Sequence, residues 1–251
     1  SNRNVGKLLV QGLHKMEYRG YDSAGIALHQ NDQIAHLRTL GKVKLLEDKM
    51  ISEKPKSKLG IAHTRWATHG EPSEENAHPH KSKERVYIVH NGIIENYLEL
   101  KEYLKTEGYS FLSQTDSELI AHMLDFFLNQ GNSMIDSMYL TQEKLDGAYA
   151  IAVVDKEDNS NIVLARNKSP LLIGIGTDEF LAASDPLAIG QLTNEFIFLE
   201  DGDVAQISAE DFAIYDIDKK KVTREITKID ISDQATSKGE YKHFMEKEIY
   251  E

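Results

Sequence analysis

The sequence predicts an α+β domain in which helices and antiparallel strands form stacked layers. Apolar residues recur with helical spacing in several stretches before residue 146. After Gly147 they fall instead in short runs separated by turn clusters such as 157–161 and 201–203, which is typical of an antiparallel meander. No internal repeat or low-complexity linker divides the chain. We therefore expect one domain over residues 1–231, followed by a polar tail over 232–251 with its own short helix.

The helices are predicted by apolar side chains that fall on one face. Residues 5–16 carry such a stripe, and Gly20 can end this first helix. A shorter stripe covers residues 43–50. The same reasoning places the remaining helices over residues 97–104, 120–127 and 133–145.

The start of the 120–127 helix carries its own signature. Thr115 followed by Glu118 three residues later has the spacing of a capping box. On that pattern, Asp116 is a first-turn acid that favours the helix dipole. It could also face the ammonium group of a ligand, and the two uses do not exclude each other.

Strands are predicted by alternation and by short apolar runs. Ala24, Ile26 and Leu28 alternate, and residues 34–37 can pair with them across a turn. Residues 85–90 form a strand that leads into Asn91 and Gly92. The other expected strands cover residues 59–62, 148–154, 162–165, 171–175, 180–183, 196–199, 204–207 and 212–215.

Composition limits the classes of partner. The chain of 251 residues has 29 basic and 41 acidic side chains, for a formal net charge of −12. Nucleic acids and anionic membranes reward clustered basic residues, so we expect neither as a partner. We find no signal peptide and no apolar stretch near the roughly 18 residues of a membrane helix, so we expect a cytoplasmic protein. The absence of cysteine excludes disulfides, cysteine–zinc sites and a thiol nucleophile within this sequence.

Polar side chains gather in residues 63–80, directly after the expected 59–62 strand. Gly70 and Pro72 interrupt regular structure there. The Arg65 guanidinium can make two parallel hydrogen bonds to a carboxylate, and the Trp66 ring can form one side of a binding pocket. Hydroxyl groups come from Thr64 and Thr68. The segment therefore predicts a loop that binds a small carboxylate-bearing ligand.

Four histidines in the same segment raise the alternative of a metal site. His63, His69, His78 and His80 are the candidate ligands. Against this, no carboxylate lies at a familiar ligand spacing, and the rings of His78 and His80 are expected to point in different directions. We expect no metal and no cofactor.

Asn91 and Gly92 allow two interpretations. An Asn-Gly pair after a strand is most often a hairpin turn. Alternatively, the Asn91 side-chain amide and the Gly92 N–H form an oxyanion hole that stabilises a tetrahedral intermediate. Arg19, near the end of the first helix, is on pattern alone a cation that interacts with the helix terminus.

Taken together, five segments resemble the glutaminase domains of the glutamine:fructose-6-phosphate aminotransferases, a family of class II glutamine amidotransferases. The resemblance runs essentially from end to end, and residues 238–251 look like the family's connection to its sugar-phosphate isomerase region. The five segments are Glu17-Tyr-Arg-Gly-Tyr-Asp-Ser-Ala-Gly25, His63-Thr-Arg-Trp-Ala-Thr-His-Gly70, Asn91-Gly-Ile-Ile-Glu-Asn96, Gln114-Thr-Asp-Ser-Glu118 and Lys168-Ser-Pro-Leu-Leu-Ile-Gly174.

The resemblance implies a fold and a set of roles. The fold is that of the N-terminal-nucleophile hydrolases, an αββα sandwich with two antiparallel sheets between helical layers. Arg65 would bind the α-carboxylate of L-glutamine, and Asp116 would bind its α-ammonium group. Asn91 and Gly92 would form the oxyanion hole. The side chains that would shape and close the pocket are Trp66, Thr68, His69 and Arg19.

One departure concerns the nucleophile. In the family it is an N-terminal cysteine that opens an apolar first strand and uses its own α-amino group as base. This sequence has no cysteine, and we expect the family's first strand to be missing from it. Ser1 could replace the cysteine in principle, but the polar residues 1–4 cannot form a buried central strand. As printed, the chain is expected to bind glutamine weakly without turning it over.

The resemblance also implies the activity of a parent enzyme. Ammonia released from glutamine would be transferred to fructose 6-phosphate on an isomerase region, giving glucosamine 6-phosphate. The parent enzyme is expected to be a homodimer that pairs through the isomerase regions. The alternative is a glutamine-binding sensor that has kept the pocket and lost catalysis.

Overall fold

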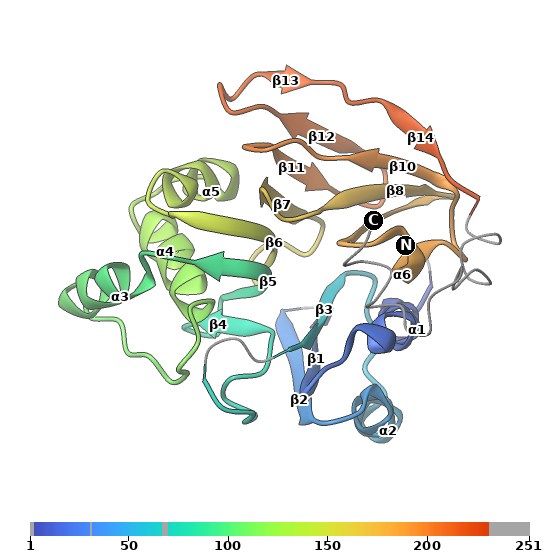
Figure 1. Cartoon of the computed structure of the whole chain (residues 1–251), viewed down its shortest axis with the longest axis horizontal. Coiled ribbons are helices and arrows are strands. Elements are labelled where there is room, and N and C mark those ends of the chain that lie inside the picture. Colours follow the sequence, from blue (N-terminus) through green and yellow to red (C-terminus); the bar gives the residue numbers. More distant parts are fainter. Residues whose placement is uncertain (1–2, 31, 67–69, 231–251) are drawn as a thin grey trace, which may run out of the picture.

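The structure, a computed structural model, describes residues 3–30, 32–66 and 70–230. Within these residues the strands form two stacked β layers covered by helices on both outer faces (Figure 1). One layer is a seven-stranded sheet of order β13-β12-β11-β7-β6-β5-β4. The other layer contains the sheets β2-β1-β3 and β14-β10-β8-β9. The expected αββα arrangement is confirmed.

The helical elements are α1 (Val5–Met16), a 3₁₀ turn (Glu17–Arg19), α2 (Val43–Glu53), α3 (Tyr97–Thr106), α4 (Glu118–Asn129), α5 (Met134–Gln142) and α6 (Pro186–Ile189). The strands of the first half are β1 (Ser23–Gln30), β2 (Gln33–Leu40), β3 (Gly60–Arg65), β4 (His80–Ser82) and β5 (Val86–Ile94). Those of the second half are β6 (Gly147–Asp155), β7 (Ile162–Asn167), β8 (Leu172–Gly176), β9 (Glu179–Ala183), β10 (Glu195–Phe198), β11 (Val204–Ile207), β12 (Phe212–Tyr215), β13 (Lys221–Val222) and β14 (Ile226–Lys228).

Helix α1 begins and ends as its sequence indicates. The Asn4 side chain accepts a hydrogen bond from the Gly6 N–H at the first turn. After the 3₁₀ turn the chain reverses at Gly20, whose φ of 85° suits a residue without a Cβ. The apolar face of α1 packs with α2 on the sheet β2-β1-β3.

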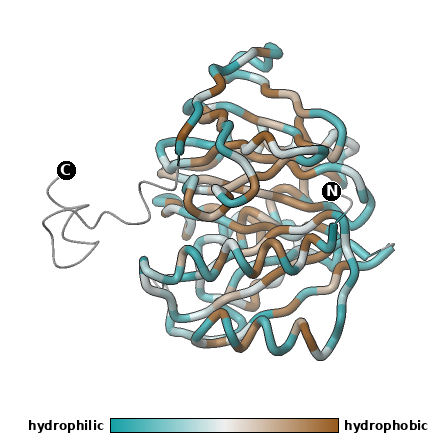
Figure 2. Tube along the Cα trace, turned by 90° about the vertical axis from the view of Figure 1, so that its right-hand side faces the viewer, coloured by the Kyte–Doolittle hydropathy of each residue, from teal (hydrophilic) through white to brown (hydrophobic). Residues whose placement is uncertain are grey.

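Helix α4 is the most buried helix of the described chain. Ten of its twelve residues are buried, because it lies between the seven-stranded sheet and the helices α3 and α5. The two β layers contact each other through a second set of apolar side chains, as when Leu164 and Ala205 meet Ile173 and Ile197. Figure 2 shows these hydrophobic positions running through the interior of the stacked strands. The core therefore has three interfaces, between four layers.

Within the described residues, the expected helices and strands are found, with shifts of a few residues at their ends. Five elements were not expected, namely the 3₁₀ turn, β4, α6, β13 and β14. All five are short, and β14 is exposed along its length. Strands of this kind are held by hydrogen bonds to a neighbour rather than by apolar content of their own. The helix expected in the tail lies outside the described residues.

Asn91 and Gly92 do not form a hairpin turn, so that interpretation is wrong. Strand β5 pairs with β6 without interruption from Val86 opposite Asp155 to Ile94 opposite Gly147. The Asn-Gly pair lies inside this ladder. Its glycine is required by the neighbouring strand rather than by a turn.

The capping box at Thr115 and Glu118 is also wrong. Helix α4 begins at Glu118, and its N-cap Ser117 makes no side-chain capping hydrogen bond. The Glu118 carboxylate reaches back to the N–H groups of Leu112 and Ser113. Asp116 consequently precedes the helix and is not a first-turn acid.

Strands β3 and β9 are edge strands of their sheets. Among the described residues, β3 pairs with β1 alone and β9 pairs with β8 alone. Each therefore keeps one row of backbone N–H and C=O groups outside the sheet ladder.

Among the helices of the same described part, none combines the length and the apolar character needed to cross a bilayer.

Candidate functional site

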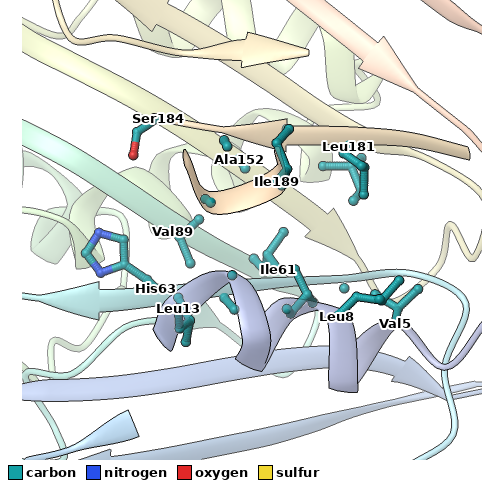
Figure 3. A pocket seen from close by; sticks show the side chains of 18 of the residues that line it. Val5, Leu8, Leu13, Ile61, His63, Val89, Ala152, Leu181, Ser184 and Ile189 are labelled. Carbon is teal, nitrogen blue, oxygen red and sulfur yellow. The ribbon is translucent and has the colours of Figure 1, made fainter. Parts of the chain in front are cut away.

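A cavity of about 1040 Å³ lies between the edge strands β3 and β9. Helix α1, strand β5, helix α6 and residues 115–117 complete its wall. Figure 3 shows apolar side chains of α1 and β3 facing those of β9 and α6, with His63 and Ser184 towards one end and Val5 and Leu181 towards the other. The predicted site residues in the described chain all line this cavity: Arg19, Arg65, Trp66, Asn91, Gly92 and Asp116.

Arg65 is the buried cation of the cavity. It is the last residue of β3, and only 5% of it is exposed. Its guanidinium donates to Asp22 Oδ1 at 3.3 Å and to the Gly70 carbonyl oxygen at 3.2 Å. Asp22 directly precedes β1, the neighbour of β3, so the sheet places this ion pair. The guanidinium is held in a fixed orientation, as a two-point carboxylate contact requires.

Asp116 brings a buried carboxylate to the cavity. Its Oδ2 accepts the N–H of Ile94 at 2.8 Å, at the end of β5, and its Oδ1 accepts the Ser117 hydroxyl at 3.3 Å. Only 4% of the residue is exposed. The carboxylate is thus fixed by backbone from the strand that also carries Asn91 and Gly92. Arg65 and Asp116 bring opposite charges to one cavity, which suits a zwitterion.

Gly92 lies where its strand comes very close to β6. A Cβ on Gly92 would be 1.9 Å from the Ala148 carbonyl oxygen, and its φ of 142° is one that glycine favours. Asn91 is exposed and lies opposite Ala150 in the ladder. A rigid strand therefore presents both residues to the cavity. Rigid placement is what an oxyanion hole needs, because its donors must not reorganise during reaction.

Trp66 and Arg19 lie at the rim. The Trp66 ring packs over Gly20, although 58% of the residue stays exposed. Arg19 donates to Asp185 Oδ2 at 2.6 Å and to the Tyr18 hydroxyl at 3.0 Å. Asp185 is the N-cap of α6 and accepts the Leu187 N–H. The helix-end interpretation of Arg19 is incomplete, because its ion pair connects the end of α1 to α6.

Three of the four predicted histidine candidates lie in the described chain and come together beside the cavity. The rings of His63 and His78 are 4.3 Å apart, and those of His78 and His80 are 4.6 Å apart. The His78 and His80 rings meet edge to face with their planes at 74°, and His78 Nδ1 accepts the His90 N–H whereas His80 Nε2 lies beside Thr115 Oγ1. In the described residues no group of three or more His, Cys, Asp or Glu side chains has a geometry that could hold a metal ion.

Burial keeps these imidazoles neutral. It lowers the pKa of His63 to about 3, with a further decrease from His90 and Arg65. Burial likewise lowers the pKa of His80 to about 3, against an opposing contribution from Glu118. His78 has its pKa lowered by burial and by the neighbouring histidines. The wall of the cavity therefore supplies neutral hydrogen-bonding groups at physiological pH.

Two predicted site residues, Thr68 and His69, lie outside the described residues. Sequence reasoning missed Asp22, Asp185, His90 and Ser117, which hold or flank the predicted side chains. His90 Nδ1 lies 2.8 Å from Ser117 Oγ, which in turn contacts Asp116. The signal for Asp22 was its place in the segment from Glu17 to Gly25. The signal for Asp185 was an N-cap residue followed by proline, a common helix start.

The fold defines the class of this protein as the N-terminal-nucleophile type of glutamine amidotransferase. The structure superposes with a TM-score of 0.72 on the Bacillus subtilis glutamine phosphoribosylpyrophosphate amidotransferase, at 24% identity over 84% of this chain and 46% of that one. A second solved structure, an allosteric regulatory enzyme of purine biosynthesis, gives a TM-score of 0.73 at 25% identity, again over 84% of this chain and 46% of that one. These likenesses establish the fold.

The family follows from sequence. Residues 63–191 match the model of the glutamine amidotransferase domain, and the chain belongs to this family. The whole chain is 48% identical to the glutamine–fructose-6-phosphate aminotransferase [isomerizing] of Vibrio parahaemolyticus and 49% identical to that of Haemophilus influenzae. It spans 41% of the length of each of these relatives.

Proposed function

We propose that this domain binds L-glutamine in the cavity and belongs to an enzyme that hydrolyses it to glutamate and ammonia. The ammonia would be transferred to fructose 6-phosphate, bound elsewhere in the whole protein, to give glucosamine 6-phosphate. The names of the relatives support this substrate pair. The proposal includes a cytoplasmic location and a homodimeric whole protein that pairs outside residues 1–231.

The observation that carries the proposal is the placement of Arg65 and Asp116 on one cavity. A glutamine molecule has an α-carboxylate and an α-ammonium group on the same carbon. In the proposed complex the Arg65 guanidinium binds the first and the Asp116 carboxylate binds the second. Because both side chains are buried and fixed by partners, the site is organised before the ligand arrives.

The proposed chemistry acts at the other end of glutamine. A thiolate attacks the side-chain amide carbon, and the negative charge moves to the carbonyl oxygen. The Asn91 side-chain amide and the Gly92 N–H stabilise this oxyanion. The α-amino base passes the thiol proton to the amide nitrogen, and collapse of the intermediate then forms a thioester and expels ammonia. Water then hydrolyses the thioester to glutamate and regenerates the thiol.

The thiol must come from residues outside this sequence, which contains no cysteine. The cavity supports such an arrangement, because it is bordered by the open edges of β3 and β9 and lined by apolar side chains. An apolar strand that pairs with either edge would carry a nucleophile at its start into the region of Arg65, Asn91 and Asp116. We therefore propose that residues 1–251 alone bind glutamine and do not turn it over.

The test compares two proteins. Isothermal titration with L-glutamine is performed on the chain of residues 1–251, and glutamate release is measured on the same chain preceded by a cysteine-headed apolar strand. The expected results are binding by the first and turnover by the second. The proposal would be overturned if the first protein failed to bind glutamine and the second failed to turn it over. Arg65→Ala should weaken binding by roughly 2–4 kcal/mol, because a bidentate charged contact is lost.

The matched control is Arg85→Ala. Arg85 also pairs with carboxylates, Asp155 and Glu157, but lies away from the cavity. This substitution should leave the glutamine affinity unchanged. An equal loss of affinity in both variants would assign the effect of Arg65 to general destabilisation.

The absence of cysteine favours a second candidate function, a sensor that binds glutamine without chemistry. It predicts the same binding by residues 1–251. The sensor function differs in its prediction for glutamate release. The chain preceded by the cysteine-headed strand would then bind glutamine and release no glutamate.

A further inference from the structure

We propose that Glu118 is a positioning residue for Asp116, and thus sets the affinity of the site for the α-ammonium group of the substrate. The inference rests on the proposed function, since it concerns the same site. Glu118 is the first residue of α4 and is 96% buried, yet it does not line the cavity. Its carboxylate binds the chain that leads into Asp116.

Three hydrogen bonds fix the Glu118 carboxylate. Oε1 accepts the Leu112 N–H at 2.9 Å, and Oε2 accepts the Ser113 N–H at 2.6 Å and the Ser113 hydroxyl at 2.7 Å. His122, one turn further along α4, places its Nε2 3.5 Å from Oε1. A single buried carboxylate thus joins the start of α4 to the segment that precedes it. Three donors are satisfied by one side chain that cannot move without leaving them unpaired.

Ser113 also fixes Thr115, the residue directly before Asp116. The Ser113 hydroxyl oxygen also accepts the Thr115 N–H at 3.3 Å and lies 3.0 Å from Thr115 Oγ1. Thr115 Oγ1 lies in turn 3.1 Å from His80 Nε2 on β4. The segment 112–115 is therefore fixed from α4 on one side and from the seven-stranded sheet on the other. Asp116 follows directly.

Asp116 in turn contacts β5. Asp116 Oδ2 accepts the Ile94 N–H, whereas the Glu118 carboxylate accepts from Leu112 and Ser113. If Glu118 fixes the turn, loss of its hydrogen bonds must weaken the Asp116–Ile94 bond indirectly. The Ile94 amide is therefore a reporter for the position of Asp116 that is separate from glutamine binding.

The geometry agrees with the charge state of Glu118. Burial alone would favour the neutral acid, but the neighbouring His122 and the hydrogen bonds from Leu112 and Ser113 outweigh it and lower the pKa of Glu118 to about 2. An ionised carboxylate accepts at both oxygens at every pH at which the protein would be assayed. In Glu118→Gln, the side-chain amide would keep one acceptor oxygen. Its NH₂ group would face an N–H donor and could not accept a hydrogen bond from it.

The test uses Glu118→Gln with Asp125→Asn as its matched control. Asp125 lies on the same helix, is 99% buried and also accepts hydrogen bonds, from the Tyr109 hydroxyl and the Asn129 amide. It does not line the cavity, and its carboxylate pairs with Lys83. Both variants should lose stability in urea. Only Glu118→Gln should raise the Kd for L-glutamine, by about tenfold, which corresponds to about 1.4 kcal/mol.

Hydrogen exchange at Ile94 supplies the second readout. Its amide should exchange about tenfold faster in Glu118→Gln and at the original rate in Asp125→Asn. In the complete enzyme, Glu118→Gln should raise KM more than it lowers kcat, since it acts on substrate binding. Should Glu118→Gln fail to fold, Ser113→Ala removes one hydroxyl partner and tests the same relay with a smaller change.

The outcomes separate the inference from the proposed function. Glutamine binding by the unsubstituted chain, with unchanged Kd and unchanged Ile94 exchange in Glu118→Gln or Ser113→Ala, overturns the inference alone. No glutamine binding by the unsubstituted chain overturns the proposed function. Faster Ile94 exchange in that case would still show that Glu118 positions Asp116, and would remove only its link to the substrate.

Discussion

The Trp66 ring lies against the backbone of Gly20, so closely that a Cβ on Gly20 would be 1.9 Å from Trp66 Cζ3. The contact joins the end of β3 to the turn after α1. The first prediction is that Gly20→Ala displaces the ring, because the new methyl group and the indole cannot occupy the same space. The fluorescence of Trp66 should shift, and the affinity for glutamine should fall by about tenfold or less.

The control for this variant is Gly108→Ala. Gly108 has a φ of 87°, close to the 85° of Gly20, and a Cβ there would meet nothing within 4 Å. It therefore carries the backbone cost of a positive φ, about 1 kcal/mol, without a steric clash. If both variants shift the fluorescence equally, the contact between Trp66 and Gly20 has no specific role.

A second prediction uses the fact that Trp66 is the single tryptophan of the chain. It lies at the rim of the cavity and is more than half exposed. Binding of L-glutamine should change its solvent contact, so the emission should change with a saturable dependence on glutamine. D-glutamine should give no such change, because with its charged groups on Arg65 and Asp116 its side chain would point away from Asn91 and Gly92. An identical response to both enantiomers would contradict the predicted binding mode.

A third prediction concerns acid stability. The pKa of His36 is lowered to about 4, first by burial and then by Arg38. In the unfolded chain this histidine returns to about 6.5, so the unfolded state binds more protons between pH 4 and pH 6.5. The free energy of unfolding should therefore fall as the pH decreases through this window. His63 and His80 act in the same direction, and their window extends to about pH 3.

Urea unfolding of His36→Gln measures one of these contributions. The side-chain amide introduced at position 36 can still donate to the Pro79 carbonyl oxygen, as the His36 imidazole does at 2.8 Å. The pH dependence of the unfolding free energy between pH 4 and 6.5 should become shallower by up to about 1.4 kcal/mol per pH unit. Above pH 7.5 the two proteins should have the same pH dependence. A steeper dependence in the variant would show that His36 is charged in the folded state.

A fourth prediction separates catalysis from folding at Asn91. In an enzyme that includes the nucleophile, Asn91→Ala should lower kcat by about 10²–10³-fold, the usual effect of removing one oxyanion donor. Because Asn91 is exposed, the unfolding free energy should stay within about 0.5 kcal/mol. Ammonia-dependent synthesis, measured on the same protein, should be unaffected. A kcat within threefold of the original would remove Asn91 from the proposed mechanism.

The sequence predicted the elements well because their signals are local. Residues 5–16 and the run of strands after Gly147 carry their own periodicity, and the structure confirms both. The features that it predicted wrongly depend on distant contacts. Asn91 and Gly92 carry a turn signal, but the nine-residue ladder with β6 overrides it. Glu118 has the spacing of a capping residue, but its hydrogen bonds go to the preceding segment.

The site was predicted as a set of residues but not as a geometry. Arg65 and Asp116 were chosen from motifs, and the structure brings them to one cavity. Their supporting partners are far away in sequence, since Asp22 is 43 positions from Arg65 and Ile94 is 22 positions from Asp116. No local pattern encodes such pairs. They follow only from the register of β1 with β3 and from the end of β5.

The open edges of β3 and β9 also determine how this chain should behave at high concentration. In the described residues these edges offer backbone groups outside the sheet ladders beside apolar side chains, the combination that promotes edge-to-edge association. Copies of residues 1–251 should therefore aggregate through these two strands as concentration rises. A short apolar peptide that pairs with them would act as a stabilising ligand, raising the unfolding temperature and keeping the domain dispersed.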